Sequence, residues 1–246
     1  MLCKLKLELY GDNLSFRKSS NLQGVLFEHI DSDYATFLHS QSINPYSQSI
    51  IRENDKWIWT INTLTDEARK YIIEPLLDEG FSEFSFRKEP NNSIRIMSKK
   101  IEELDIKELL KSFYDVEADK YYNIQVMTPA AFKKDGEYCV MPDIRLILQS
   151  LMNKCNTILA ELDMTDEDTL KYMSTHTTLL SYKLNTTRFP LEGTSVPGFY
   201  GSMIFKMKGT STMAAFIRIL LKFGEYSGIG IKTSMGMGAI KLIERE

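Results

Sequence analysis

Apolar and polar residues alternate along residues 2–10, where Leu5, Leu7 and Leu9 are separated by Lys6 and Glu8. A period of two is typical of a strand with one buried face. In the N-terminal part, apolar residues recur every two residues in some segments and about every 3.6 residues in others, which predicts strands and helices respectively. We expect strands at 2–10, 48–52, 56–64, 81–87 and 94–98, and helices at 21–30, 32–39 and 65–78.

Turn-forming residues and helix caps mark the boundaries of these elements. Asn44-Pro45 ends the second helix, and Ser32 and Thr65 are of residue types that cap helix N-termini. The segment 90–92 (Pro-Asn-Asn) is expected to form the turn between the last two strands. Residues 101–113 are expected to form a charged, helix-like connector.

The pattern then restarts in the C-terminal part. We expect strands at 121–127, 179–184, 201–207 and 237–243, helices at 142–159 and 213–223, and an acidic segment, 163–168, that caps a short helix ending at Met173. Each part has the order strand, helix, two strands, helix, strand, which is the ferredoxin-like βαββαβ pattern. The sequence therefore predicts an α+β fold of two tandem ferredoxin-like domains, residues 1–117 and 118–246.

The composition is that of a soluble globular protein, with 43% hydrophobic and 26% charged residues. No apolar run reaches the length of a membrane span, and the N-terminus lacks the apolar core of a signal peptide. We therefore expect a cytoplasmic protein with no membrane partner. Cys3, Cys139 and Cys155 form no CxxC pair, so neither a disulfide framework nor a zinc site is indicated.

The net charge of −3 is unevenly distributed along the chain. Residues 1–120 contain 16 Lys+Arg and 21 Asp+Glu, whereas the region from Lys171 onward contains 10 basic and 4 acidic residues. The basic region surrounds the glycine-rich residues 228–238, which hold two Gly-hydrophobic-Gly units. Such a charge distribution favours an anionic ligand at that stretch.

The glycine-rich stretch contains Lys232, Thr233 and Ser234 between its two glycine units. Glycine lets another chain approach the backbone N–H groups closely, so the stretch is a candidate phosphate cradle. The alternative is a tight turn before the last strand. Thr233 stands where a dinucleotide fingerprint needs its third glycine, and Lys232 follows Ile231 instead of the glycine of a P-loop. Both nucleotide motifs are therefore excluded.

Four motifs follow one another in the C-terminal part. They are residues 125–132 (Gln-Val-Met-Thr-Pro-Ala-Ala-Phe), Pro142 opening a helix, residues 196–205 (Val-Pro-Gly-Phe-Tyr-Gly-Ser-Met-Ile-Phe) and residues 228–238. Together they resemble the CRISPR-associated endoribonucleases of the RAMP superfamily, which cut repeat RNA into guide RNAs. The resemblance covers most of 120–246, and 1–115 through the order of elements and one histidine.

The resemblance implies domains related to the RNA-recognition motif and cleavage that needs neither metal nor cofactor. In such cleavage a 2′-hydroxyl attacks the neighbouring phosphate and leaves a 2′,3′-cyclic phosphate and a 5′-hydroxyl. The reaction needs a proton acceptor, a proton donor and positive charge near the phosphate. An imidazole changes protonation near neutral pH, which suits either proton role.

The resemblance points to His39, which lies after the first helical region and before Pro45-Tyr46, as the general acid or base. The alternative is a surface histidine that interacts with a helix dipole. His29 lies on an apolar stripe, where packing is expected and a supporting catalytic role is the alternative. The family's first-helix tyrosine and nearby lysine are missing, so Tyr34 and Tyr46 are the local phenols that could complete the site, unless they pack in the core.

Backbone and side-chain groups of the glycine-rich stretch are the predicted RNA contacts: Gly228, Gly230, Lys232, Thr233, Ser234, Gly236 and Gly238. Asp31 and Asp33 stand close to His39, and two carboxylates with an imidazole are a candidate metal site. A helix cap with acids in the first turn explains these carboxylates equally well. We therefore predict no metal.

The leading hypothesis is an endoribonuclease that processes CRISPR precursor RNA. One alternative is a non-catalytic RNA-binding subunit of a CRISPR effector complex, and another is a ligand-sensing regulator with the same fold. The predicted partners are CRISPR repeat RNA, effector-complex subunits and a second copy of the chain.

Overall fold

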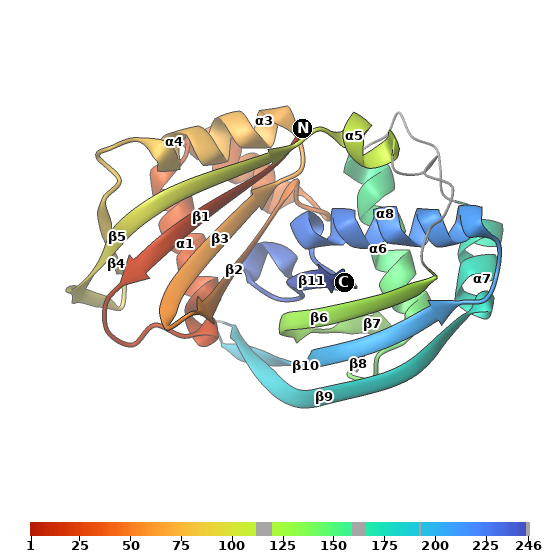
Figure 1. Ribbon diagram of the computed structural model, residues 1–246. Helices are drawn as coiled ribbons and strands as arrows, with labels where there is room; N and C mark the ends of the chain where they lie inside the picture. The colour runs from red at the N-terminus through yellow and green to blue at the C-terminus, as the bar shows by residue number, and fades with distance from the viewer. Residues whose placement is uncertain (112–119, 159–165, 192, 245–246) are drawn as a thin grey trace.

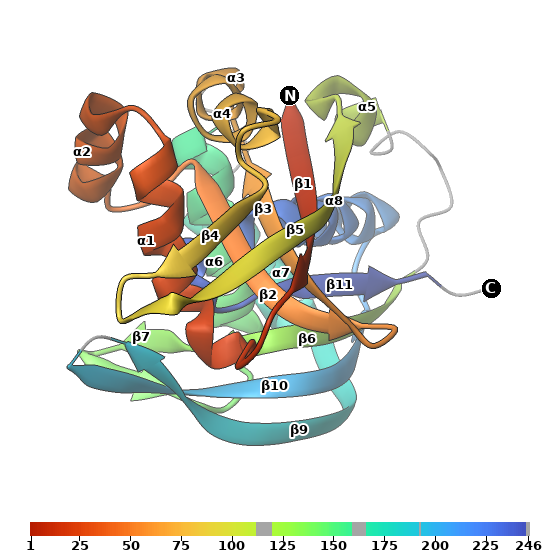
Figure 2. The same ribbon diagram turned by 90° about the vertical axis from the view of Figure 1, so that its left-hand side faces the viewer.

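The computed structural model describes residues 1–111, 120–158, 166–191 and 193–244. Each half of the chain forms an antiparallel sheet with helices packed on one face, and the two sheets lie next to each other (Figure 1). A view turned by 90° shows α1 and α2 beside the N-terminal sheet (Figure 2). The predicted α+β class with tandem ferredoxin-like units is confirmed.

The N-terminal sheet has the strand order β2-β3-β1-β5-β4. Its elements are β1 (Leu2–Tyr10), a 3-10 turn η1 (Phe16–Lys18), α1 (Ser19–His29), α2 (Ser32–Ser40), β2 (Tyr46–Glu53), β3 (Lys56–Thr63), α3 (Asp66–Ala68), a π-helical turn η2 (Arg69–Ile73), α4 (Glu74–Leu77), β4 (Glu83–Phe86), β5 (Glu89–Leu104) and α5 (Ile106–Lys111). The ferredoxin-like order is completed by β5, which pairs antiparallel with β1. Strand β4 is therefore an additional edge strand.

The C-terminal sheet has the order β11-β6-β10-β9, the ferredoxin-like arrangement without an extra strand. Its half contains β6 (Tyr121–Ala130), β7 (Phe132–Lys134), β8 (Glu137–Cys139), α6 (Ile144–Ile158), α7 (Glu167–His176), β9 (Thr177–Leu191), β10 (Thr194–Met207), α8 (Ser211–Ser227), a 3-10 turn η4 (Thr233–Met235) and β11 (Ile240–Ile243). Strands β7 and β8 form a separate hairpin that the sequence did not predict.

Each half buries its own apolar cluster. Leu5, Leu7 and Trp59 are buried in the N-terminal cluster, and the alternation along β1 places Leu5, Leu7 and Leu9 there as predicted. A third, smaller cluster contains Phe189 and Met237, and Phe16 from the N-terminal half packs against it. This small cluster joins the two halves beside the glycine-rich stretch.

Strand β5 is much longer than the predicted strand at 94–98. The expected turn residues 90–92 lie inside it, and residues 101–104 of the expected helical connector pair with the start of β1. The helix begins only at Ile106, and the connector's last predicted residue, 113, lies outside the described residues. The difference arises because strand pairing is a long-range contact that local periodicity does not report.

Helix boundaries in the C-terminal half also differ from the prediction. Helix α6 starts at Ile144 with the Asp143 carboxylate accepting from the Leu146 N–H, so Pro142 precedes the helix instead of opening it. Its predicted last residue, 159, lies outside the described residues, as do residues 163–165 of the acidic segment. Asp166 of that segment does cap α7, through the Thr169 N–H.

Three C-terminal strands are longer than predicted and one is shorter. Strand β6 continues to Ala130 instead of ending at 127. Strand β9 (177–191) extends beyond the predicted 179–184, and β10 (194–207) begins before the predicted 201. The two strands pair over this whole length. The last strand starts at Ile240, because residues 237 and 238 belong to the glycine-rich stretch and residue 239 is not in a regular element either. The predicted domain boundary at 117 lies outside the described residues. In the described parts of the chain, no helix has the length and apolarity to cross a membrane.

Candidate active site

The glycine-rich stretch forms a loop, residues 228–238, between α8 and β11 (the glycine loop). Gly228, Gly230, Gly236 and Gly238 have positive φ, as does Lys232. A Cβ on Gly238 would lie 2.0 Å from the Ile229 carbonyl oxygen. Glycine is therefore required by both conformation and space.

The N–H groups of this loop are largely committed inside the protein. Those of the four glycines donate to Gly224 O, Ser150 Oγ, Thr233 O and Pro129 O. The predicted cradle of glycine N–H groups thus has its donors in use. Lys232 is the exposed charged side chain that the loop presents.

Gln48, on β2, fixes the glycine loop against the N-terminal half. Its side-chain amide donates to Ser234 O at 3.0 Å and to Ser19 O at 3.2 Å, and its oxygen accepts from Trp59 Nε1 at 2.7 Å. Gln48 is buried. Because buried polar groups are costly to leave unpaired, this arrangement sets the position of the loop relative to α1.

His39 lies in the last turn of α2 and lines a cavity of about 700 Å³. Its ring packs edge-on against Phe27, with centroids 4.7 Å apart. The start of α1, the β4–β5 turn and the end of β9 form the other walls, and Met235 of the glycine loop also lines the cavity. These segments lie near one another in Figure 2. The cavity joins the predicted catalytic histidine to the glycine loop.

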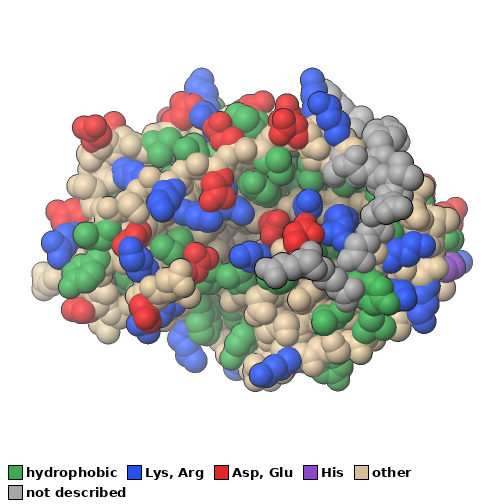
Figure 3. Space-filling view, viewed as in Figure 1, with side chains coloured by type: hydrophobic (Ala, Val, Ile, Leu, Met, Phe, Trp, Pro, Cys, Tyr) green, Lys and Arg blue, Asp and Glu red, His purple; other side chains and the backbone are tan. Residues whose placement is uncertain are grey.

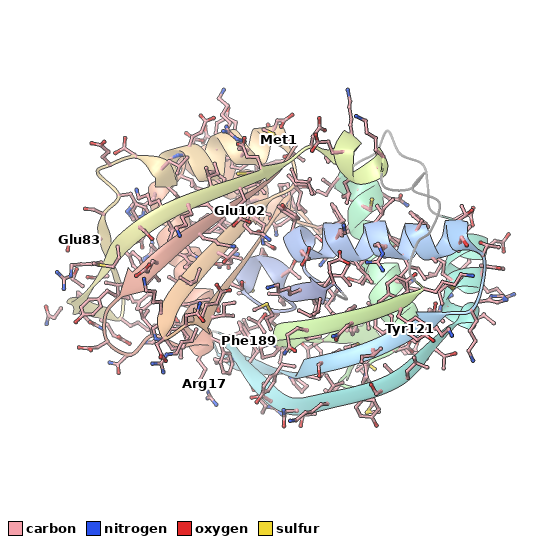
Figure 4. The ribbon with its side chains drawn as sticks, in the orientation of Figure 1. Met1, Arg17, Glu83, Glu102, Tyr121 and Phe189 are labelled. Atoms are coloured by element: carbon pink, nitrogen blue, oxygen red, sulfur yellow. The ribbon has the colours of Figure 1, made fainter. Side chains whose placement is uncertain are left out.

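Four cations line this cavity, Arg17, Lys18, Arg87 and Lys88, and the first three differ in how their charge is balanced. Lys18 pairs with Glu89, and Arg87 pairs with Glu28. Arg17 has no carboxylate partner within the described residues, and its guanidinium lies 5.8 Å from the Phe16 ring. Figure 4 labels Arg17 near Phe189, where the two halves meet. Arg17 is therefore available to an anionic ligand.

Sequence reasoning did not identify Arg17 or Lys18. A signal was present, because two adjacent cations directly precede the first predicted helix in an acidic half of the chain. What could not be seen was that the start of α1 shares a cavity with His39 of α2, because no local pattern reports which segments meet in the fold.

Tyr46 lies behind the cavity. Its hydroxyl bonds to Gln23 Nε2 at 2.8 Å, and Gln23 lines the cavity with His39. Phe27 contacts both the His39 ring and the Tyr46 ring, and its centroid lies 6.5 Å from that of Tyr46. Burial raises the pKa of the Tyr46 hydroxyl above its usual range. Tyr46 can therefore act on the site through Gln23.

Tyr34 and His29 are not brought to His39 as catalytic partners. Tyr34 is buried and stacks on Tyr71 at 4.6 Å, and burial raises the pKa of its hydroxyl. His29 bonds through Nδ1 to Val25 O and packs against Phe81. The geometry of both side chains favours packing.

The carboxylates near His39 act on the helix. Asp31 caps α2 by accepting from the Asp33 and Tyr34 N–H groups at 3.0 and 2.9 Å. Within the described residues, no group of three or more His, Cys, Asp or Glu side chains could hold a metal ion.

Lys154 on α6 is a further residue, besides Arg17 and Lys18, that the sequence did not single out. Its ammonium donates to Gly228 O at 2.8 Å, to Ser227 O at 3.2 Å and to Thr233 Oγ1 at 3.4 Å. Burial lowers the pKa of this ammonium to about 7. Lys154 thus fastens the glycine loop to α6.

A hollow of about 530 Å³ also opens between the two sheets, and it carries charges of both signs. Lys6 pairs with Glu102 at 2.8 Å, and Lys4 lies over the Tyr226 ring. Figure 3 shows basic and acidic side chains mixed across the middle of this face. A mixed surface is less suited to a polyanion than a basic one.

Comparison with known proteins identifies the family. The model of the CRISPR-associated endoribonuclease Cas6 family matches residues 124–240. Cas6 of Streptococcus thermophilus is 40% identical over 223 residues, which cover 91% of this chain and 90% of that protein. Cas6 of Mycobacterium tuberculosis (strain CDC 1551 / Oshkosh) is 37% identical over 90% of this chain and 70% of that protein.

Solved structures share the fold. A Cas6 product complex superposes with a TM-score of 0.81 at 20% identity, covering 99% of each chain. A structure described as a RAMP protein binding different RNA substrates superposes with a TM-score of 0.63 at 18% identity, covering 98% of this chain and all of that one. With 40% identity across nine tenths of both chains, this protein belongs to the CRISPR-associated endoribonuclease Cas6 family.

Proposed function

We propose that the protein cleaves CRISPR repeat RNA to give guide RNAs, and that the cut is made in the His39 cavity. The observation that carries this proposal is that His39 and Arg17 line one cavity of about 700 Å³. The cavity therefore combines a proton-transfer group with a cation that has no carboxylate partner among the described residues. Relatives named as endoribonucleases support the reaction class.

The proposed reaction needs no metal. The 2′-oxygen of one nucleotide forms a bond to the adjacent phosphorus as the bond to the 5′-oxygen of the next nucleotide breaks. One group takes the proton from the 2′-hydroxyl and another gives a proton to the leaving 5′-oxygen. His39 performs one of these transfers, and the Arg17 guanidinium stabilises the charge that develops on the phosphate.

The environment of His39 supports this role. The edge-on contact with Phe27 holds the ring at the rim of the cavity, and Gln23 and Asn21 line the same space with neutral polar groups. Similar folds include a Cas6 substrate mimic complex and a Cas6 variant with a histidine replaced by alanine. Together with the RAMP protein described as binding different RNA substrates, these neighbours support an RNA substrate.

The proposed partners and organisation follow from the same assignment. We propose that the C-terminal half, from residue 118, holds the RNA through Lys232, Thr233 and Ser234. The glycines shape the loop while their N–H groups donate within the protein. Effector-complex subunits and a second copy of the chain are further proposed partners, and the cytoplasm is the proposed location.

The test is incubation of labelled repeat RNA, transcribed from the CRISPR array of the source genome, with the protein in excess EDTA. We expect cleavage at one position and a product that ends in a 2′,3′-cyclic phosphate, detected by mass spectrometry. A 2′-deoxy nucleotide before the cut should prevent the reaction. Binding without cleavage, with or without added Mg²⁺, would favour the non-catalytic subunit instead.

A further inference from the structure

A second cavity, of about 550 Å³, also borders the glycine loop. The loop contributes Met235 to the His39 cavity and residues 230–234 to this one. Its other walls are residues 42–44 before β2, the β7–β8 hairpin and one face of α6. We call it the lysine cavity.

The charges that line the lysine cavity all have one sign. Lys133 comes from β7, Lys154 from α6 and Lys232 from the glycine loop, and Tyr138 of β8 is the other titratable side chain. No Asp or Glu belongs to the lining, and residues 42–44 add no titratable group. Among the described residues, none of the three lysines forms an ion pair with a carboxylate.

Lys154 is the buried charge of this cavity, with 7% of its surface exposed. Two of its three hydrogen bonds go to the glycine loop and the third to Ser227 O at the end of α8, so its protons are used within the protein while its charge lies below the cavity. A buried ammonium without a counter-charge is unfavourable, and the lowered pKa of Lys154 has burial as its cause. An anion bound in the cavity would supply the missing charge.

We propose that the lysine cavity binds a phosphodiester group of the repeat RNA, with Lys133 and Lys232 contacting the phosphate from the exposed rim and Lys154 supplying charge from below. This proposal rests on the proposed function for the identity of the RNA. The glycine loop would then lie between two cavities. RNA is cut in the His39 cavity, and a phosphate distant from the cut is bound in the lysine cavity.

The test measures the affinity of the non-cleaving His39→Ala protein for the labelled repeat RNA over a range of salt concentrations. In this background, Lys133→Ala and Lys232→Ala should each weaken binding about tenfold. Each should also reduce the slope of log Kd against log salt concentration by about one phosphate contact. Lys107→Ala, on α5 and outside the cavity, is the matched control and should change neither quantity.

Lys154 adds a readout that simple loss of structure would not reproduce. A bound phosphate favours the protonated ammonium, so the affinity of the His39→Ala protein should fall as the pH rises from 6 to 8.5. Lys154→Met should bind more weakly at pH 6 and lose this dependence. If Lys154→Met does not fold, the Lys133 and Lys232 variants still decide the question, because both side chains are exposed.

Two results would overturn the proposal while leaving the proposed function intact. One is unchanged affinity and unchanged salt slope in both rim variants of a protein that binds the repeat RNA, which would also remove Lys232 from the proposed RNA contacts but leave the proposed cleavage in the His39 cavity untouched. The other is thermal stabilisation by inorganic phosphate that both rim variants lose without any change in RNA affinity, which would assign the cavity to a free anion. A parent protein that binds no repeat RNA would contradict the proposed function itself.

Discussion

The His39 cavity and the lysine cavity share the glycine loop but balance their charges differently. In the first, Lys18 and Arg87 are paired with glutamates, whereas Arg17 has no carboxylate partner among the described residues and shares the cavity with His39. In the second, three lysines face the cavity without a carboxylate in the described lining. Paired cations give a defined geometry, whereas unpaired ones give attraction for a polyanion. This difference supports our proposal that one cavity performs the cleavage and the other holds the RNA.

The largest expected effect comes from His39→Ala. Loss of a proton-transfer group should reduce the single-turnover cleavage rate by about 10³-fold, while RNA affinity stays within a few-fold. The rate is measured at saturating protein with labelled repeat RNA. His176→Ala, at the end of α7, is the matched control and should cleave normally. His29→Ala should behave like this control, and a comparable loss there would return His29 to the site.

Gly236→Ala should displace the glycine loop, which lies between the two cavities and lines both of them. The new Cβ would lie 2.2 Å from Ser19 Cβ, at a φ of 109°. We expect the free energy of unfolding to fall by about 3 kcal/mol, measured by urea denaturation. Gly193→Ala is the control, because its φ is also positive but no atom lies within 4 Å of its Cβ. An equal loss in both variants would show that backbone strain alone is responsible.

Arg17→Ala should lower the cleavage rate at saturating RNA by about 10- to 100-fold, because a transition-state charge loses its cation. Arg17→Lys should recover part of the rate, since it restores charge without the planar donor geometry. Arg95→Ala removes an exposed guanidinium over the Tyr10 ring and should leave the rate unchanged. If Arg17→Ala weakens RNA affinity and leaves the cleavage rate unchanged, Arg17 binds RNA as the lysines are proposed to do, and the proposed difference in role between the two cavities does not extend to it.

The smallest expected effect is on stability as a function of pH. Burial lowers the pKa of Lys154 to about 7 in the folded protein, whereas an unfolded lysine keeps a value of about 10.4. Between these values the unfolded state binds more protons, so the free energy of unfolding should rise with pH. We expect a rise of about 1–2 kcal/mol from pH 7 to pH 9 relative to Lys154→Met, measured by urea denaturation. An identical pH profile in both proteins would show that Lys154 is not a buried charge.

Local patterns predicted the parts of the molecule that local physics determines. The alternation along β1, the histidine at the end of α2 and the glycines that need positive φ can all be recognised in short windows of sequence. The length of β5 could not be predicted, because residues 101–104 become a strand only by pairing with β1.

The same limit applies to the candidate site. Gln48 and Lys154 look like ordinary polar positions in a strand and a helix, and their roles depend on burial against residues distant in the sequence. Tyr34 and Tyr46 were equivalent phenols in the sequence, and packing separates them, one stacked on Tyr71 and one bonded to Gln23.

The most direct test compares His39→Ala with the Lys133→Ala/Lys232→Ala double variant in one single-turnover assay in excess EDTA. We expect opposite results: the histidine variant keeps its RNA affinity and loses its cleavage rate at saturating RNA, whereas the double variant loses affinity and keeps that rate. If the double variant lost its saturated rate as severely as the histidine variant, the division between a cutting cavity and a holding cavity would be contradicted.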